Sequence, residues 1–193
     1  MSFTIMFVDD SDTEVGAFKR FHSLTNDTQK PDVKVGDFSI EHHKTAGAEF
    51  FIPRSGAQAT ALYKTLHETN TTVHLIYMDN QMDGTNAGER AIKTIRALEE
   101  GWGINSCPIH FNTYAPESVT DAGIKATVLG TSKCRSKADY RAVMSKVPDA
   151  PDLLPAAKPK GIVEVKEVDA DAAKQAAKTA ALLASLTSGR QPR

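Results

Sequence analysis

Short apolar runs that alternate with helix-like segments most strongly constrain how this chain folds. Phe3 to Val8 is almost entirely apolar, is too short for a helix, and ends abruptly at Asp9-Asp10. Val73 to Met78 is a second such run and ends at Asp79. Runs of this length are typical of strands that helices bury on both faces, as in parallel sheets. Further strands are expected at 109–112, at 127–132, and at 38–42 or 49–52, two pieces that a Gly-containing loop would join as a hairpin.

Helical patterns separate the apolar runs. Ser11 and Glu14 have the spacing of a capping box, and Ser55 is expected to cap a second helix. Further helices are expected at 87–98, 116–124 and 138–147. Strands that alternate with helices predict an α/β fold, a doubly wound parallel sheet with helices on both faces.

Composition excludes several classes of function. The 193 residues carry 23 Lys and Arg against 24 Asp and Glu, a net charge of −1, which disfavours a broad nucleic-acid surface. No stretch approaches the roughly 20 apolar residues of a membrane-spanning helix, and the N-terminus lacks the basic start of a secretory signal. The two cysteines show no metal-ligand spacing. We therefore expect a cytoplasmic protein without membrane or nucleic-acid partners.

The composition changes after the last expected helix, so the folded domain is placed at 1–147. Closely spaced prolines predict an extended linker over 148–168. Residues 169–187 are rich in alanine and predict a helix that docks on a partner or forms a homodimer. Residues 188–193 are expected to be disordered.

Polar residues stand at the ends of the expected strands. Asp9, Asp10 and Asp79 follow the first two runs, and Thr113 and Lys133 follow two later strands. In open α/β sheets ligands bind outside the carboxyl ends of the strands. Carboxylates that converge there favour a hard cation such as Mg²⁺, and one of them can act as a nucleophile that forms an aspartyl-phosphate. The alternative for Asp9 and Asp10 is that they only cap the helix that follows them.

Together these residues resemble the receiver domain of two-component response regulators over about residues 3–147. The matching segments are Ile-Met-Phe-Val-Asp-Asp-Ser at 5–11, Leu-Ile-Tyr-Met-Asp-Asn-Gln-Met at 75–82, Cys-Pro-Ile-His-Phe-Asn-Thr-Tyr-Ala at 107–115 and Thr-Ser-Lys at 131–133. The resemblance implies a five-stranded parallel sheet in the order 2-1-3-4-5. It also implies an insertion near 30–55, because the first acids and the acceptor lie further apart than in the family.

The resemblance also implies a role for each polar residue. Asp79 would accept a phosphoryl group from a histidine kinase or a histidine phosphotransfer protein. Thr113 and Lys133 would bind the phosphoryl oxygens. Mg²⁺ would be held by three carboxylates and one backbone carbonyl, those of Asp9, Asp10, Asp79 and Gln81.

Three positions depart from the family pattern. The loop after the acceptor passes from Met82 directly into Asp83-Gly84, as if three residues were missing. Cys134 follows Lys133 where the family has a proline in cis, so this loop is expected to take a different path. Gly130 stands where the family carries an aromatic switch residue. We therefore expect intact phosphorylation chemistry and an unusual route of signal output.

Three functions remain open at this point. The first is a response regulator without a DNA-binding output domain, which signals to an unknown output protein and is no enzyme beyond its own phosphorylation and dephosphorylation. The second is a pseudo-receiver, a protein-binding scaffold that works without phosphorylation, which Gly130 and Cys134 favour. The third is a metal-dependent phosphohydrolase, which the lack of a second general acid near Asp79 in the sequence disfavours.

Overall fold

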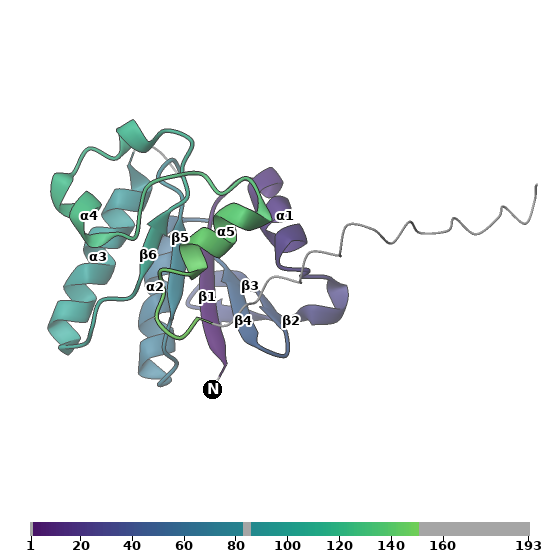
Figure 1. Cartoon of the computed structure of the whole chain (residues 1–193). Coiled ribbons are helices and arrows are strands. Elements are labelled where there is room, and N and C mark those ends of the chain that lie inside the picture. The colour runs from purple at the N-terminus through teal and green to yellow at the C-terminus, as the bar shows by residue number, and fades with distance from the viewer. Residues whose placement is uncertain (1, 83–85, 151–193) are drawn as a thin grey trace, which may run out of the picture. The chain divides into compact units, whose positions relative to one another are not determined.

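A mixed sheet of six strands forms the centre of the part of the chain, residues 2–82 and 86–150, that the computed structural model describes. The strands lie in the order β2-β3-β4-β1-β5-β6 (Figure 1). The parallel neighbours are β4 (Ala48–Ile52), β1 (Phe3–Val8), β5 (Leu75–Met78) and β6 (Ile109–Phe111). The antiparallel strands β2 (Gln29–Val35) and β3 (Phe38–Lys44) extend the sheet beyond β4.

This sheet corrects the predicted five-stranded parallel sheet at both edges. The segment 127–132 is not a strand, because α4 ends at Thr127 and only Thr131 forms a bridge, with Phe111. At the other edge, 38–42 and 49–52 are both strands and form the expected hairpin. β2 is an additional strand that the sequence pattern hid, because most of its residues are exposed, three of the seven are charged, and they show no apolar run.

Five α-helices in the described residues cover the two faces of the sheet. They are α1 (Asp12–Phe21), α2 (Gly56–Glu68), α3 (Ala87–Trp102), α4 (Ala122–Thr127) and α5 (Lys137–Met144). The side chains of Ser11 and Ser55 cap α1 and α2 as expected. The single helix predicted at 116–124 is wrong. A 3-10 turn (Pro116–Ser118) precedes α4 instead, because the side chain of Asp121 caps a separate helix there.

Two apolar cores lie on opposite faces of the sheet. On one face, Met6 and Val8 of β1 pack with α2, α3 and α4, and on the other, Ile5 and Phe7 pack with α1 and α5. This alternation explains why β1 reads as a continuous apolar run. Each fully buried large side chain contributes roughly 1.5–3 kcal/mol to folding.

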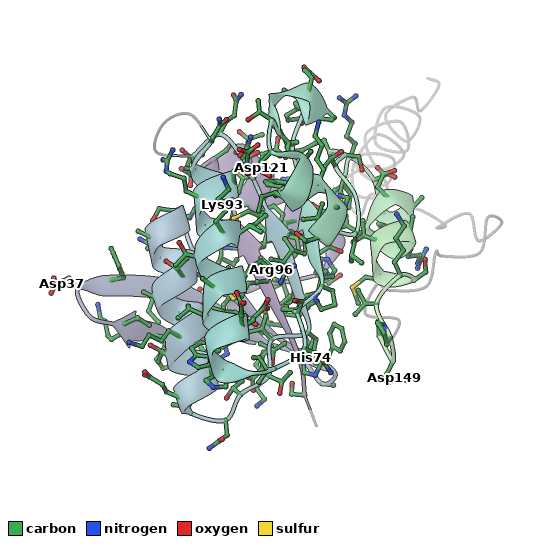
Figure 2. All side chains as sticks on the ribbon, turned by 90° about the vertical axis from the view of Figure 1, so that its left-hand side faces the viewer. Asp37, His74, Lys93, Arg96, Asp121 and Asp149 are labelled. Carbon is green, nitrogen blue, oxygen red and sulfur yellow. The ribbon has the colours of Figure 1, made fainter. Side chains whose placement is uncertain are left out.

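A buried carboxylate joins the helices on the α3 face. Glu99 of α3 accepts hydrogen bonds from the Tyr63 hydroxyl at 2.7 Å and from the Cys107 backbone amide at 2.7 Å. Arg96 balances its charge at 2.6 Å and donates to the carbonyl of Thr127 at the end of α4. Figure 2 shows Arg96 and Lys93 on α3, and Lys93 pairs with Asp121 at 2.7 Å at the start of α4. These contacts fix α4, which has only six residues, to α3 at both of its ends.

The remaining sequence predictions about organisation fall outside the described residues. The loop at Asp83-Gly84, the linker at 148–168 beyond residue 150, the helix at 169–187 and the tail at 188–193 belong to this part of the chain. Within the described residues, no helix combines the length and the apolar character needed to cross a membrane.

His22, next to the end of α1, is a buried titratable group with no ionic partner. Its ring lies 4.5 Å from that of Phe18 and 5.2 Å from that of Phe50, and neither ring nitrogen has a hydrogen-bond partner in the described part of the chain. Burial lowers the pKa of His22 from 6.5 to about 4, because it penalises the charged ring. The ring is therefore neutral at pH 7.

We predict that acid destabilises the protein through His22. The folded state resists protonation and the unfolded state does not, so this part of the unfolding free energy is complete above pH 6.5 and is lost as the pH falls toward 4. The loss approaches about 3 kcal/mol over this window. His22→Phe keeps an aromatic ring without a titrating group. Its unfolding free energy, measured with urea, should increasingly exceed that of the wild type as the pH falls, and a difference that does not change with pH would contradict the assignment.

Candidate functional site

The carboxyl ends of the parallel strands form one polar pocket. The register pairs Val8 of β1 with Met78 of β5, and Met78 with Phe111 of β6, so the residues that follow these strands become neighbours. The pocket has a volume of about 270 Å³. Its lining includes every residue that the sequence predicted for the site, namely Asp9, Asp10, Asp79, Gln81, Thr113 and Lys133.

Three carboxylates converge in this pocket. Asp9, Asp10 and Asp79 each offer one oxygen, and these oxygens lie within 4.8 Å of one another. Burial, and to a smaller degree the charge of Asp79, raises the pKa of Asp9 to about 6, although Lys133 and the Ser11 amide act against this. Burial also raises the pKa of Asp79, against a hydrogen bond of 3.0 Å from the Gln81 amide. A divalent cation among these carboxyl groups would stabilise their ionised forms, which burial disfavours. Mg²⁺ prefers hard oxygen ligands of this kind.

The first turn of α3 positions Asp79. A Cβ atom at Gly88 would lie 2.2 Å from the backbone carbonyl oxygen of Asp79, so only glycine allows the helix to approach the strand end this closely. The Asn80 side chain accepts a hydrogen bond of 3.1 Å from the Glu89 amide at the start of the same helix. The position of Asp79 is thus fixed by contacts between β5 and α3.

Lys133 is held by acceptors inside the pocket. Its ammonium group lies 3.3 Å from Asp9 Oδ2, 3.1 Å from Glu14 Oε2 and 3.3 Å from the backbone oxygen of Asn112. Burial alone would lower the pKa of Lys133, but the carboxylates around it outweigh burial and raise the pKa. The ring of Tyr114 covers the ammonium group at 4.7 Å, an interaction between a cation and an aromatic face.

Glu14 and Tyr114 are site residues that the sequence analysis missed. The Tyr114 hydroxyl donates to Glu14 Oε1 at 3.0 Å, so one carboxylate binds both the tyrosine and Lys133. Glu14 had an apparent role in the capping box with Ser11, and this concealed its second role. Tyr114 directly follows Thr113, and this position next to a predicted site residue was the signal in the sequence that could have identified Tyr114.

The segment after Lys133 is stabilised by a residue that the sequence analysis also missed. All peptide bonds in the described residues are trans, so Cys134 does not reproduce a cis-proline turn. Its backbone amide, which a proline would lack, donates to the Asn112 side chain at 2.8 Å. The Cys134 thiol is buried, and burial raises its pKa to about 12, so this side chain has the character of a small buried hydrophobic group and not of a reactive thiol.

The position of Gly130 offers no aromatic side chain for a switch. A Cβ atom there would lie 3.6 Å from His110 Nδ1 and 3.7 Å from Lys146 Nζ. The His110 ring also contacts the backbone oxygen of Ser132 at 2.9 Å. The exposed aromatic side chain beside the pocket is instead that of Tyr114, which is 59% exposed.

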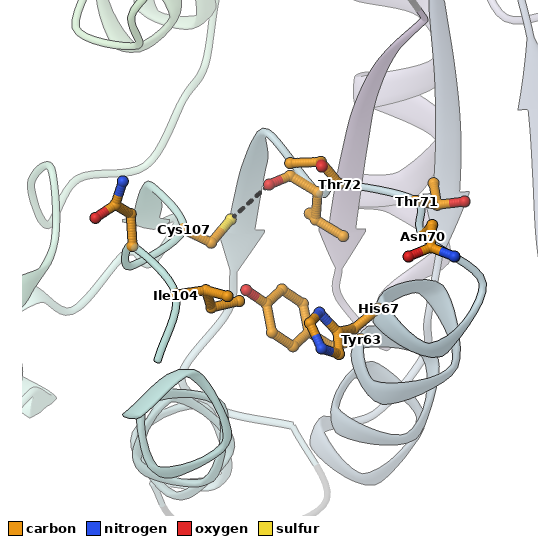
Figure 3. Close-up of a pocket in the computed structure, with 9 residues that line it drawn as sticks. Tyr63, His67, Asn70, Thr71, Thr72, Ile104 and Cys107 are labelled. Carbon is orange, nitrogen blue, oxygen red and sulfur yellow. Dashed lines mark hydrogen bonds between the residues drawn. The ribbon is translucent and has the colours of Figure 1, made fainter. Parts of the chain in front are cut away.

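A larger pocket of about 360 Å³ lies at the amino ends of β5 and β6, away from the acidic residues. Figure 3 shows Tyr63 and His67 of α2 on one side and Ile104 and Cys107 on the other. The Cys107 thiol donates to the backbone oxygen of Val73 at 3.3 Å, which satisfies its hydrogen. No Asp, Glu, Lys or Arg lines this pocket, in contrast to the acidic pocket at the carboxyl ends of the strands.

We predict that Gly88→Ala displaces Asp79 and destabilises the fold. The added Cβ atom meets backbone rather than a flexible side chain, and overpacking of this kind costs about 1–3 kcal/mol. Gly101→Ala in the same helix is the matched control, because a Cβ atom there meets nothing within 4 Å and should stabilise by about 0.5–1 kcal/mol. Urea denaturation of both variants measures the two effects, and equal stabilities would contradict the close approach at Gly88.

We predict that the affinity for Mg²⁺ falls in acid. The metal needs the ionised carboxylate, and Asp9 binds a proton with a pKa of about 6. Below this pH the apparent affinity should fall by about tenfold per pH unit. Isothermal titration calorimetry across pH 5–8 measures the profile. Asp9→Asn should bind more weakly at neutral pH with a shallower pH dependence, and a profile of unchanged steepness in this variant would contradict the assignment to Asp9.

Comparisons with known proteins identify the fold. No protein-family model and no curated protein matches the chain. A two component response regulator from Cytophaga hutchinsonii matches with a TM-score of 0.50 and 15% identity, over 76% of this chain and 97% of that one. The bacteriophytochrome response regulator AtBRR matches with a TM-score of 0.51 and 9% identity, over 76% of this chain and 93% of that one. The resemblance inferred from the sequence is therefore confirmed at the level of fold: the chain has the α/β fold of response-regulator receiver domains.

Proposed function

We propose that the chain is a response regulator that accepts a phosphoryl group on Asp79 and signals through protein–protein contacts. The convergence of Asp9, Asp10, Asp79, Thr113 and Lys133 in one pocket carries this proposal. These residues are far apart in the sequence, and the pocket combines a nucleophile, oxygen ligands for a cation, and two hydrogen-bond donors. This is the set that phosphoryl transfer to a carboxylate requires.

The residues have distinct roles in the proposed transfer. A carboxylate oxygen of Asp79 attacks phosphorus, and the bond between phosphorus and the donor's histidine nitrogen breaks. The electron pair of that bond stays on the imidazole, which takes up a proton, and an acyl phosphate remains on Asp79. The Thr113 hydroxyl and the Lys133 ammonium group donate hydrogen bonds to the phosphoryl oxygens. Asp9, Asp10, Asp79 and the Gln81 carbonyl would hold Mg²⁺, which would supply neutralisation of the phosphoryl charge.

The chemistry of the acceptor defines the partners. The donor is a phosphohistidine on a histidine kinase or a histidine phosphotransfer protein, and the output partner is a protein without an assigned identity. The chain turns over no external substrate in this role, and we place it in the cytoplasm. The segment 169–187, which lies outside the described residues, is proposed as an element for docking or for a homodimer.

A second candidate, the pseudo-receiver, has specific support at two positions. Gly130 provides no aromatic switch, and Cys134 replaces the proline of the family pattern. In this alternative the fold binds partners without phosphorylation. The two candidates differ in one measurable property, the formation of an acyl phosphate on Asp79.

We predict that acetyl phosphate with Mg²⁺ adds one phosphoryl group to the full chain. The product should be lost on treatment with hydroxylamine, as an acyl phosphate is, and intact-protein mass spectrometry measures both steps. Asp79→Asn should form no adduct, because it removes the nucleophile. Asp37→Asn, which alters an exposed acid outside the pocket, should behave as wild type. Absence of the adduct on the wild type would favour the pseudo-receiver, and an adduct on Asp79→Asn would reject Asp79 as the acceptor.

A further inference from the structure

Lys133 has no free hydrogen-bond donor left for a phosphoryl group. An ammonium group has three N–H donors, and the structure gives this one three oxygen acceptors, on Asp9, Glu14 and Asn112. The Lys133 side chain is only 3% exposed, so water has little access to its ammonium group. Lys133 can therefore contact a phosphoryl oxygen only if it gives up one of the three contacts.

Glu14 is the contact that Lys133 can give up most readily. The acceptor on Asn112 is its backbone oxygen, at the end of β6. The backbone amide of Asn112 donates a hydrogen bond to the Met78 oxygen at 2.9 Å. The Asp9 carboxylate is buried, with its side chain 2% exposed, and it belongs to the acidic cluster. Glu14 reaches the pocket from α1 through a longer side chain that is 16% exposed, so it can rotate toward solvent.

Tyr114 is coupled to the same contact. Its hydroxyl is bonded to one oxygen of Glu14 while Lys133 is bonded to the other. Its ring contacts Lys133 at 4.7 Å and the Arg135 guanidinium at 5.1 Å. Because the ring is 59% exposed, these polar contacts, and not burial in a core, set its orientation. Loss of the Glu14–Lys133 pair frees the carboxylate to which the Tyr114 hydroxyl is bonded, so the contacts that orient the Tyr114 side chain change.

Resting on the proposed function, we infer that Glu14 and Tyr114 form a latch that competes with the phosphoryl group for Lys133. In the unphosphorylated chain the Glu14 carboxylate is paired with the Lys133 ammonium group. The phosphoryl group on Asp79 brings new negative charge into the pocket that Glu14 also lines, so it attracts Lys133 and repels Glu14. Glu14 then turns outward and the Tyr114 ring is released, which changes the surface beside the pocket. The latch supplies a switch that does not require an aromatic residue at Gly130.

The test uses the full chain with beryllofluoride, a phosphoryl mimic, in the presence of saturating Mg²⁺. Glu14→Gln keeps the size of the side chain and removes its charge. Asp12→Asn is the matched control, because Asp12 is an acid of the same helix whose side chain is 94% exposed and pairs with Arg54 instead of Lys133. Calorimetry should show roughly tenfold tighter binding of beryllofluoride to Glu14→Gln than to Asp12→Asn.

A second measurement follows the tyrosine directly. With 3-fluorotyrosine incorporated, the fluorine resonance that is absent in Tyr114→Phe belongs to Tyr114. This resonance should shift when beryllofluoride binds to the wild type, and in free Glu14→Gln it should already lie near the shifted position. Equal beryllofluoride affinities of Glu14→Gln and Asp12→Asn, or a Tyr114 resonance that does not respond, would overturn the latch while leaving the proposed function intact. Absence of binding to every variant would overturn both proposals.

Discussion

Buried charge at the carboxyl ends of the parallel strands is the constraint on which the rest of the site depends. The side chains of Asp9 and Lys133 are 2% and 3% exposed, and charges buried this deeply need partners, which each of these two residues supplies to the other. Their contact, at 3.3 Å, links the end of β1 to the segment after Thr131. Hydrogen bonds hold that segment along β6, among them the one from the Ser132 amide to the Phe111 oxygen at 3.0 Å, and the ion pair adds a connection to the end of β1.

The same segment shows how a departure from a family pattern is accommodated. An amide at Cys134 that had no acceptor would cost about 1–3 kcal/mol on burial. Asn112 supplies the acceptor from β6, and its backbone oxygen accepts from Lys133, so one residue stabilises two consecutive positions. The loop therefore places Lys133 in the pocket without the proline that the family pattern contains.

The parallel strands and the pocket residues were predictable from the sequence because both depend on local signals. β1 and β5 are short apolar runs, and a polar residue that ends such a run must lie at the sheet edge. β2 was not predictable in this way, because an exposed edge strand need not carry an apolar pattern. Glu14 and Asn112 were missed for a different reason. Their partners, Lys133 and Cys134, are distant in the sequence, and only the folded chain brings them together.

The loop that carries Tyr114 is anchored on both sides, which limits what can move when its contacts change. At its start Thr113 is buried at the end of β6, with its hydroxyl accepting from the Ala115 amide at 3.2 Å. At its end the buried carboxylate of Glu89 accepts from the backbone amides of Thr120 and Asp121. Glu89 in turn lies next to Gly88, whose helix turn packs on Asp79. A rearrangement at Tyr114 is therefore confined to the residues between these anchors, and α4 stays fixed to α3 while the surface next to the pocket changes.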